Sequence, residues 1–159
     1  MNMHRSSLGS VTVSIETPIT VSNQALIADS QEALLEILPE NEIFSLDAEE
    51  LTAPNCVFFV AFHYGKPMGC VALVDQLHYG EIKRLFVRPQ ARGLGLAKAL
   101  MAALEDQCRD LGLVTLRLET GTQLTEAVQL YRAQGFAECE AFGDYPVLDS
   151  SLFMEKSLA

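Results

Sequence analysis

The stretch Val87-Arg88-Pro89-Gln90-Ala91-Arg92-Gly93-Leu94-Gly95-Leu96-Ala97-Lys98 joins a strand to a long helix through a basic turn that contains two glycines. Residues 82–87 before it are typical of a strand, and Pro89 ends that strand because proline has no N–H to donate to a sheet. After the glycines, apolar residues recur at helical spacing up to Gly112, a residue type that commonly follows a helix. The spacing predicts a helix of about 19 residues, roughly 28 Å long, that starts at the glycines.

The start of this helix is a candidate anion-binding site. The first N–H groups of a helix have no partner within it, and both they and the helix dipole favour negative charge. Gly93 and Gly95 have no Cβ, so the backbone can contact a phosphate directly and adopt a positive φ where one is needed. Arg88, Arg92 and Lys98 add positive charge beside the glycines. The stretch therefore predicts a phosphate-binding turn.

Spacing distinguishes three phosphate-binding motifs at this turn. A Walker A loop requires Gly-Lys-Ser/Thr after four intervening residues, which the sequence lacks. A dinucleotide fingerprint would place its last small residue at position 98, which is Lys, and would start almost directly after the strand, whereas residues 88–92 intervene. A nicotinamide-dependent oxidoreductase is therefore disfavoured, and the third motif fits.

The third motif is the Q/R-x-x-G-x-G/A signature of the GNAT N-acetyltransferase superfamily, which Gln90-Ala91-Arg92-Gly93-Leu94-Gly95 resembles. A second segment, Ala127-x-x-Leu130-Tyr131-x-x-x-Gly135-Phe136, resembles the A-x-x-L-Y-x-x-x-G-F pattern of that family at the expected distance. The resemblance covers residues 56–157. It implies that acetyl-CoA is the acyl donor and that the turn and helix start hold its pyrophosphate. The residues implied to bind it there are Gln90, Arg92, Gly93, Leu94, Gly95, Leu96 and Ala97.

The 159 residues are expected to form a flexible tail over residues 1–10 and one GNAT-like domain over residues 11–159. We expect an α/β (α+β) fold, a GNAT-like mixed and mostly antiparallel central sheet of about seven strands with helices on both faces. One helix is expected from Ser22 to Pro39, with a break near Asp29-Ser30, and Asp47 is expected to cap a short second helix. Strands are expected over residues 11–15, 56–62, 68–74, 78–87, 113–120, 136–140 and 151–156, and a last helix over residues 125–134.

Charge is unevenly distributed in a chain whose net charge is −10. Residues 6–65 contain nine Asp or Glu and no Lys or Arg, whereas five of the eleven basic residues lie within positions 83–98. This pattern favours a discrete polyanion over a nucleic acid, whose backbone would be repelled elsewhere. The acidic part either attracts a cationic amine or forms a solvated surface.

Several expectations follow from what the sequence lacks. The sequence contains no run of 18 apolar residues, so no membrane span is expected. Residues 1–10 are not expected to form a secretory signal. The four cysteines, at 56, 70, 108 and 139, form no C-x-x-C pair and predict buried, reduced thiols in a cytoplasmic protein. No metal site is expected, and the chain is expected to be a monomer or a homodimer.

Glu81 is the candidate general base. An amine such as that of lysine is protonated at neutral pH, and freeing its lone pair costs roughly 4 to 5 kcal/mol at a pKa near 10.4. Some members of the resembled superfamily carry a catalytic Glu at this position, often acting through water. Glu81, Lys83 and Arg84 also interrupt an otherwise apolar strand, which packing alone does not require. The alternatives are a structural pair with Lys83 or Arg84, and His78 as the base.

Tyr131 matches the family tyrosine that lies near the cofactor sulfur and is implied to protonate the leaving thiolate. It also lies on an apolar stripe of its helix, so the alternative is a core tyrosine, and both can hold if the hydroxyl faces the cleft. The resemblance implies that the backbone near Phe86 or Val87 binds the oxyanion of the intermediate. Leu124 departs from the family, which often has Asn there.

The sequence therefore predicts an acetyl-CoA-dependent N-acetyltransferase that transfers an acetyl group to a primary amine by direct attack on the thioester. The acceptor is expected to be a small-molecule amine or a peptide or protein amine. The alternative is a non-catalytic acetyl-CoA-binding sensor or regulatory module. In the loop of residues 141–149, Asp144, Tyr145 and Asp149 either hold an amine or form turns.

Overall fold

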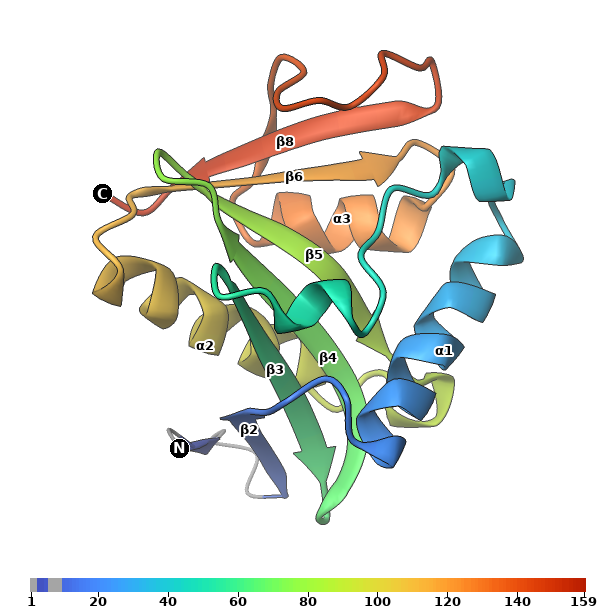
Figure 1. Cartoon of the computed structure of the whole chain (residues 1–159), viewed down its shortest axis with the longest axis vertical. Helices are drawn as coiled ribbons and strands as arrows, with labels where there is room; N and C mark the ends of the chain where they lie inside the picture. Colours follow the sequence, from blue (N-terminus) through green and yellow to red (C-terminus); the bar gives the residue numbers. More distant parts are fainter. Residues whose placement is uncertain (1–2, 6–9) are drawn as a thin grey trace.

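The strands in the computed structural model, which describes residues 3–5 and 10–159, form one sheet in the order β1-β2-β3-β4-β5-β6-β8-β7 (Figure 1). All neighbouring strands are antiparallel except β5 and β6, which are parallel. The predicted mixed, mostly antiparallel sheet is confirmed. The strands are β1 (Met3–Arg5), β2 (Val11–Ile15), β3 (Cys56–His63), β4 (Lys66–Asp75), β5 (Gly80–Val87), β6 (Thr115–Gly121), β7 (Ala137–Glu138) and β8 (Ser151–Ser157).

Helices cover both faces of this sheet, as predicted (Figure 1). Helices α2 (Leu96–Asp110) and α3 (Thr125–Ala133) contribute to a core on one face, and α1 (Val21–Leu35) contributes to a second core on the other. Alternate residues of the central strands supply the two cores because successive side chains of a strand point to opposite faces. On β3 and β4, Phe59, Ala61, Val71 and Leu73 face α2, whereas Phe58, Val60, Cys70 and Ala72 face α1.

The parallel strands β5 and β6 pair over a short length and then diverge. Gly80 pairs with Leu116 and Glu81 with Arg117, but β5 continues to Val87 and β6 to Gly121 without further pairing. Beyond Glu81, the main chain of β5 therefore lacks a neighbouring strand on the β6 side. The diverging parts, residues 82–86 of β5 and 119–121 of β6, line the same cavity.

A β-bulge lies in the part of β5 that pairs with β4 but has no partner on the β6 side. Its register with β4 shifts between Cys70 and Ala72, and Arg84 has a φ of 58°, a left-handed value that is uncommon for a side chain other than glycine. Arg84 donates from Nε to the Leu46 carbonyl at 2.8 Å and from Nη1 to Ser30 Oγ at 2.9 Å. The bulge thus directs a cationic side chain toward α1.

Helix α1 differs from its prediction at its start, at its end, which is Leu35 rather than the residue before Pro39, and in its continuity. It begins after Thr20, whose Oγ1 accepts a hydrogen bond from the Asn23 N–H at 3.1 Å, rather than at Ser22. The predicted break near Asp29-Ser30 is wrong, because the helix is continuous there. These polar residues serve tertiary contacts instead, Asp29 with Arg88 and Ser30 with Arg84, each at 2.9 Å.

Two other predicted helices are shorter in the structure than expected. The predicted second helix is only a 3-10 turn, Glu50–Thr52, although Asp47 caps it as expected by accepting the Glu50 N–H at 2.8 Å. Helix α2 has 15 residues, fewer than expected, because the glycine turn extends to Gly95, its N-cap.

The predicted flexible tail falls partly outside the described residues. Residues 1–2 and 6–9 are not described, and Met3–Arg5 forms β1, which pairs with β2. All four cysteines are free, and Cys70 and Cys108 are buried as predicted, whereas Cys56 and Cys139 are only half-buried. Across residues 3–5 and 10–159, none of the helices combines the length and apolarity of a membrane span.

Candidate active site

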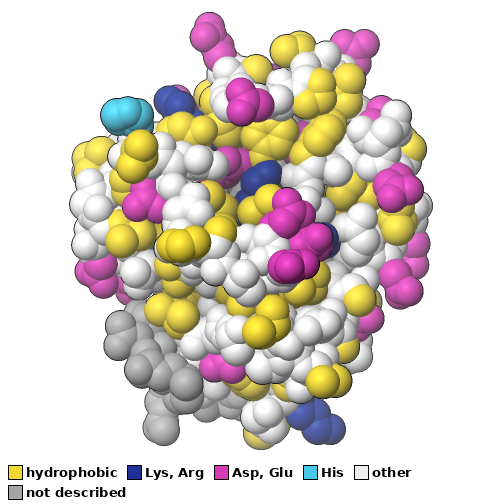
Figure 2. Space-filling view, in the orientation of Figure 1, with side chains coloured by type: hydrophobic (Ala, Val, Ile, Leu, Met, Phe, Trp, Pro, Cys, Tyr) yellow, Lys and Arg dark blue, Asp and Glu magenta, His cyan; other side chains and the backbone are white. Residues whose placement is uncertain are grey.

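A cavity of about 440 Å³ lies where β5 and β6 diverge. Its walls come from α1, from residues 36–45, from residues 82–86 of β5, from residues 119–121 of β6, and from residues 123–127 and Tyr131. Figure 2 shows this face of the molecule hollowed near its middle, with a basic side chain inside and acidic side chains around it. The cavity therefore brings together β5, which carries Phe86, α3, which carries Tyr131, and β6.

The glycine turn has the geometry of an anion-binding site. Gly93 and Gly95 have φ values of 78° and 87°, and the start of α2 has no side-chain cap. Within the part of the chain that the structure describes, the N–H groups of residues 93–98 donate no hydrogen bond. Gln90 and Leu94 are exposed beside the turn, whereas Leu96 is buried and Ala97 half-buried, so Leu96 can meet a ligand only through its backbone.

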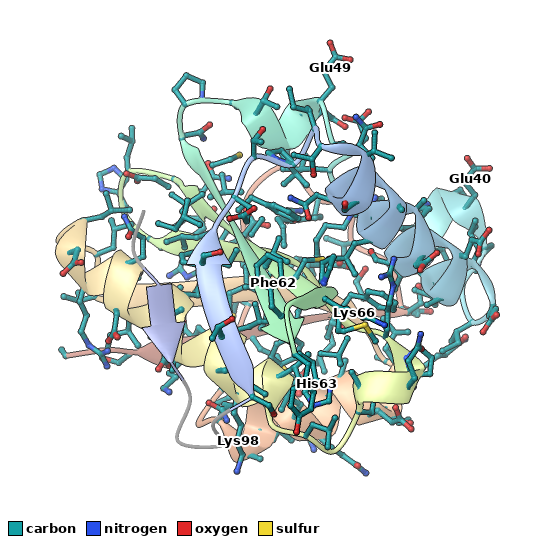
Figure 3. All side chains as sticks on the ribbon, turned by 90° about the horizontal axis from the view of Figure 1, so that it is seen from below. Glu40, Glu49, Phe62, His63, Lys66 and Lys98 are labelled. Atoms are coloured by element: carbon teal, nitrogen blue, oxygen red, sulfur yellow. The ribbon has the colours of Figure 1, made fainter. Side chains whose placement is uncertain are left out.

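The basic residues near this turn have different surroundings. Arg92 is half exposed, donates to the Val87 carbonyl at 3.3 Å and lies 3.7 Å from Glu126. Arg88 instead holds Asp29 on α1 and the carbonyl of Pro67, so it is engaged away from the glycines. Lys98 projects from the side of the molecule opposite Glu49 (Figure 3). Of the three, Arg92 alone lines the cavity.

Tyr131 is both a core residue and a cavity residue. It is 7 % exposed, and its ring packs edge-on against Phe136 with 5.7 Å between the ring centroids. Its hydroxyl makes no hydrogen bond to any described residue. Every fully buried side-chain oxygen or nitrogen of the described residues has a hydrogen-bond partner, so the Tyr131 hydroxyl is not fully buried. Because Tyr131 lines the cavity, its hydroxyl is accessible from there. Burial raises the pKa of Tyr131 well above its usual value, which keeps the hydroxyl protonated.

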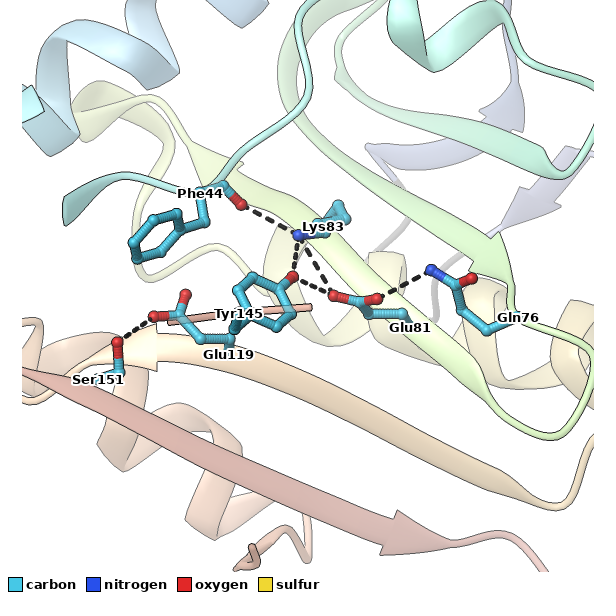
Figure 4. Close-up of polar contacts among 7 residues, drawn as sticks. All are labelled: Phe44, Gln76, Glu81, Lys83, Glu119, Tyr145 and Ser151. Carbon is cyan, nitrogen blue, oxygen red and sulfur yellow. Dashed lines mark hydrogen bonds and ion pairs between the residues drawn. The ribbon is translucent and has the colours of Figure 1, made fainter. Parts of the chain in front are cut away.

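Glu81 is 3 % exposed and fully engaged (Figure 4). Oε1 accepts a hydrogen bond from Gln76 Nε2 at 3.1 Å, and Oε2 lies 3.2 Å from Lys83 Nζ and accepts from the Tyr145 hydroxyl. The pair with Lys83 is confirmed, whereas Arg84 turns elsewhere. Glu81 is not among the residues that line the cavity, although Lys83, with which it is paired, is one of them.

Tyr145 is more than a turn residue. Its hydroxyl donates to Glu81 and accepts from Lys83 Nζ, and its ring contacts Phe44, Phe142 and Phe153 edge-on. Burial, together with the hydrogen bond to Glu81, raises the pKa of Tyr145, so the hydroxyl keeps its proton. Asp144 and Asp149 are exposed and lie outside the cavity wall. His78, the alternative base, is also exposed and outside that wall.

Glu119 lines the cavity but is not among the site residues expected from the sequence. It is on β6, and among the described residues its carboxylate accepts one hydrogen bond, from Ser151 Oγ at 2.9 Å. Burial raises the pKa of Glu119 to about 7, although the Ser151 hydroxyl and the Lys83 charge act in the opposite direction. The strand alternation was a usable signal, because buried Leu116 and Leu118 leave Glu119 on the opposite face.

The remaining predicted residues lie at the same divergence of β5 and β6. Phe86 lines the cavity, and Val87 follows it at the end of β5. Leu124, Gln123 and Thr125 all line the cavity where many family members have Asn. In the described ranges, no three His, Cys, Asp or Glu side chains are grouped so as to hold a metal ion.

Comparison with known proteins identifies the family to which this fold and cavity belong. The model of the acetyltransferase (GNAT) family matches residues 23–136. The chain therefore belongs to the GNAT family, and it is an N-acetyltransferase.

Three similar proteins illustrate the relationship. The chain is 39 % identical over 150 residues to an IAA acetyltransferase from Azospirillum brasilense, which covers 93 % of this chain and 98 % of that protein. A crystal structure described as an acyl-CoA N-acyltransferase from Klebsiella pneumoniae is 33 % identical, with a TM-score of 0.79 and coverage of 94 % and 98 % of the two chains. An N-acetyltransferase from Thermoplasma acidophilum, solved in complex with coenzyme A, shares the fold, with a TM-score of 0.75, 19 % identity and coverage of 93 % and 99 %.

Proposed function

We propose that this protein transfers the acetyl group of acetyl-CoA to a primary amine by direct attack of the amine on the thioester. The observation that carries the proposal is a single cavity that includes the Tyr131 hydroxyl, the carboxylate of Glu119, the end of β5 and Arg92 beside the free N–H groups of α2. A donor bound to those N–H groups and an acceptor in the cavity would meet between β5 and α3. The complex of the Thermoplasma acidophilum relative with coenzyme A supports the choice of donor.

The pyrophosphate of acetyl-CoA would bind the glycine turn. Gln90, Arg92, Gly93, Leu94, Gly95, Leu96 and Ala97 are the residues proposed to contact it. The thioester would lie along Phe86 and Val87 of β5. Because Arg88 N donates to the Met68 carbonyl on β4 and successive N–H groups of a strand point to opposite sides, the Val87 N–H is directed away from β4. That N–H is proposed to bind the oxyanion of the tetrahedral intermediate.

The proton transfers of the proposed reaction balance as follows. The acceptor ammonium loses one proton to a carboxylate, which later releases it to solvent, and the free amine attacks the carbonyl carbon. The C–N bond forms, and the C–S bond then breaks. The leaving thiolate takes the hydroxyl proton of Tyr131. The attacking nitrogen then gives its second proton to the Tyr131 oxygen.

Two carboxylates could accept the first proton, and they flank the Tyr145 ring in Figure 4. Glu81 is proposed for this role through the Tyr145 hydroxyl, which donates to it. Glu119 is the second candidate because it lines the cavity itself and its pKa of about 7 suits a base at neutral pH.

The pH profile distinguishes the two bases. If Glu81 is the base, Glu81→Gln should lower kcat about 100-fold and remove the acid limb of the kcat/KM profile, while Glu119→Gln keeps that limb. A base is active when deprotonated, so activity rises with pH through its pKa. An acid limb near pH 7 that persists in Glu81→Gln and disappears in Glu119→Gln would move the role to Glu119. Glu138→Gln, an exposed carboxylate on β7, is the matched control.

The proposed function is tested by following thiol release from acetyl-CoA with a panel of polyamines, amino acids, aminoglycosides and lysine peptides. The panel also includes IAA, because one relative is named an IAA acetyltransferase. We expect turnover with one class of primary amine and an N-acetyl product by mass spectrometry. Reactions without acceptor measure hydrolysis. Turnover with IAA alone, or an acetyl product on oxygen, would contradict transfer to a primary amine.

A further inference from the structure

Arg84 is a cation of the cavity wall without an anionic partner. Its two hydrogen bonds go to neutral groups, the Leu46 carbonyl and Ser30 Oγ. Among the described residues, the carboxylates that act on it are Asp47 and Glu50, and neither lies within ion-pair distance. The Nη2 group has no partner in the described chain. A half-buried guanidinium is favoured by a counter-ion, and its geometry suits a carboxylate. The left-handed backbone at Arg84, which is unfavourable for a non-glycine residue, holds this cation at the cavity.

The other two cations of the cavity wall are engaged elsewhere, one by a carboxylate of the chain and the other, in the proposed function, by the pyrophosphate of the donor. Lys83 is paired with Glu81 and also bonds to the Phe44 carbonyl and Tyr145, and Arg92 lies beside Glu126. A ligand carboxylate in the cavity would therefore meet its counter-ion at Arg84.

Glu119 is the complementary group on the facing strand. Its one hydrogen bond comes from the neutral Ser151 hydroxyl, and no ion pair involves it in the described part of the chain. The charged and titratable side chains that act on it are Lys83 and Glu81 from β5 and Tyr145 from the loop before β8. Since Lys83 is held by Glu81, the Glu119 carboxylate remains available to an ammonium group.

The wall supplied by α1 and the segment after it is largely apolar. It contains Ala33, Leu34, Ile37, Leu38, Ile43 and Phe44, together with two acidic residues, the exposed Glu36 and the half-buried Glu42. An acceptor with an apolar body would bury surface against this wall.

We infer that the acceptor is an amino acid with an apolar side chain, whose carboxylate binds Arg84 and whose amine binds Glu119. This inference rests on the proposed acetyl transfer and specifies its acceptor. It follows from two charges of opposite sign without an ion-pair partner among the described residues, one on β5 and one on β6, in a cavity that also has an apolar wall. A zwitterion would neutralise both charges, whereas a simple amine would leave Arg84 without a counter-ion.

The test compares substrates that differ only in the carboxylate. L-Phenylalanine is paired with 2-phenylethylamine, and L-leucine with 3-methylbutylamine. We expect the wild-type protein to prefer the amino acid in kcat/KM by about 10- to 100-fold, the usual range for a charged hydrogen-bonded contact. Arg84→Gln should remove this preference, and Arg84→Lys should restore part of it. Arg109→Gln, a half-exposed arginine of α2, should keep it.

The ratio of two substrates within one preparation does not depend on the fraction folded, so a merely structural role of Arg84 would leave the ratio unchanged. A wild-type preference for the simple amine, or an unchanged ratio in Arg84→Gln, would overturn the inference. Calorimetry with the CoA-bound protein separates it from the proposed function. If the amino acid binds more tightly than the simple amine in a way that depends on Arg84, but is not acetylated, the binding site is supported and the proposed transfer is not. If the amino acid neither binds nor is acetylated, both the inference and the proposed function are overturned.

Discussion

A protein that carries Gly93→Trp is expected to fold but to bind acetyl-CoA at least about 100-fold more weakly than the wild type. A Cβ at position 93 meets no atom within 4 Å, so the indole would extend into the space beside the free N–H groups of residues 93–98. That space is where the pyrophosphate is proposed to bind. Isothermal calorimetry with acetyl-CoA measures the effect directly and needs no acceptor.

Gly112→Trp is the matched control for this prediction. Gly112 follows the other end of α2 and has a φ of 77°, against 78° at Gly93, and its Cβ would also meet no atom within 4 Å. The two variants therefore carry the same backbone strain, of order 1–3 kcal/mol, and should have similar melting temperatures. Normal acetyl-CoA affinity in folded Gly93→Trp, or equal loss in both variants, would rule out the phosphate-binding turn.

Tyr131→Phe is expected to lower kcat about 100-fold while acetyl-CoA affinity stays within about twofold. The substitution removes only the hydroxyl, so the edge-on contact with Phe136 and the packing of the ring remain. Burial raises the pKa of Tyr131, so the wild-type enzyme should show no loss of activity from this group in mildly alkaline solution. Steady-state kinetics between pH 6 and pH 10 measures both effects.

Tyr64→Phe is the control for Tyr131→Phe, because Tyr64 is 79 % exposed in the β3–β4 hairpin and should tolerate the loss of its hydroxyl. A kcat in Tyr131→Phe within about threefold of the wild type would mean that the thiolate leaves without help from this residue. In that case Tyr131 is a core residue whose hydroxyl happens to face the cavity.

The parts of the fold set by local pattern were predictable from the sequence. Alternation and turn residues placed the central strands, and helical spacing placed α2 and α3 to within a few residues. The polar pair Asp29-Ser30 misled the prediction of α1 because a single sequence does not show that Arg84 and Arg88 lie opposite it. Long-range contacts of this kind decide whether a polar residue interrupts a helix or makes tertiary contacts from within a continuous helix.

The candidate site was predictable where a motif spans neighbouring residues, and less so elsewhere. Gly93, Gly95 and Tyr131 were named from local patterns, and the structure places them around one cavity or beside it. The surroundings of Glu81 depend on Tyr145, which is 64 residues away along the chain. The alternation of buried and exposed residues along β6 indicated which face Glu119 occupies, but its exposure to the cavity depends on how far β5 and β6 diverge.

That divergence gives β5 an edge in the interior of the molecule. Edge strands usually lie at the outside of a sheet, where their free N–H and C=O groups can pair with another chain. Here an extended ligand with amide groups can add to β5 as a short temporary strand, recognised by main-chain atoms. If the proposed donor binds in this way, we expect residues 85–87 to tolerate substitution while the donor is kept, and we expect selectivity for the acceptor to depend on the side chains of the facing walls.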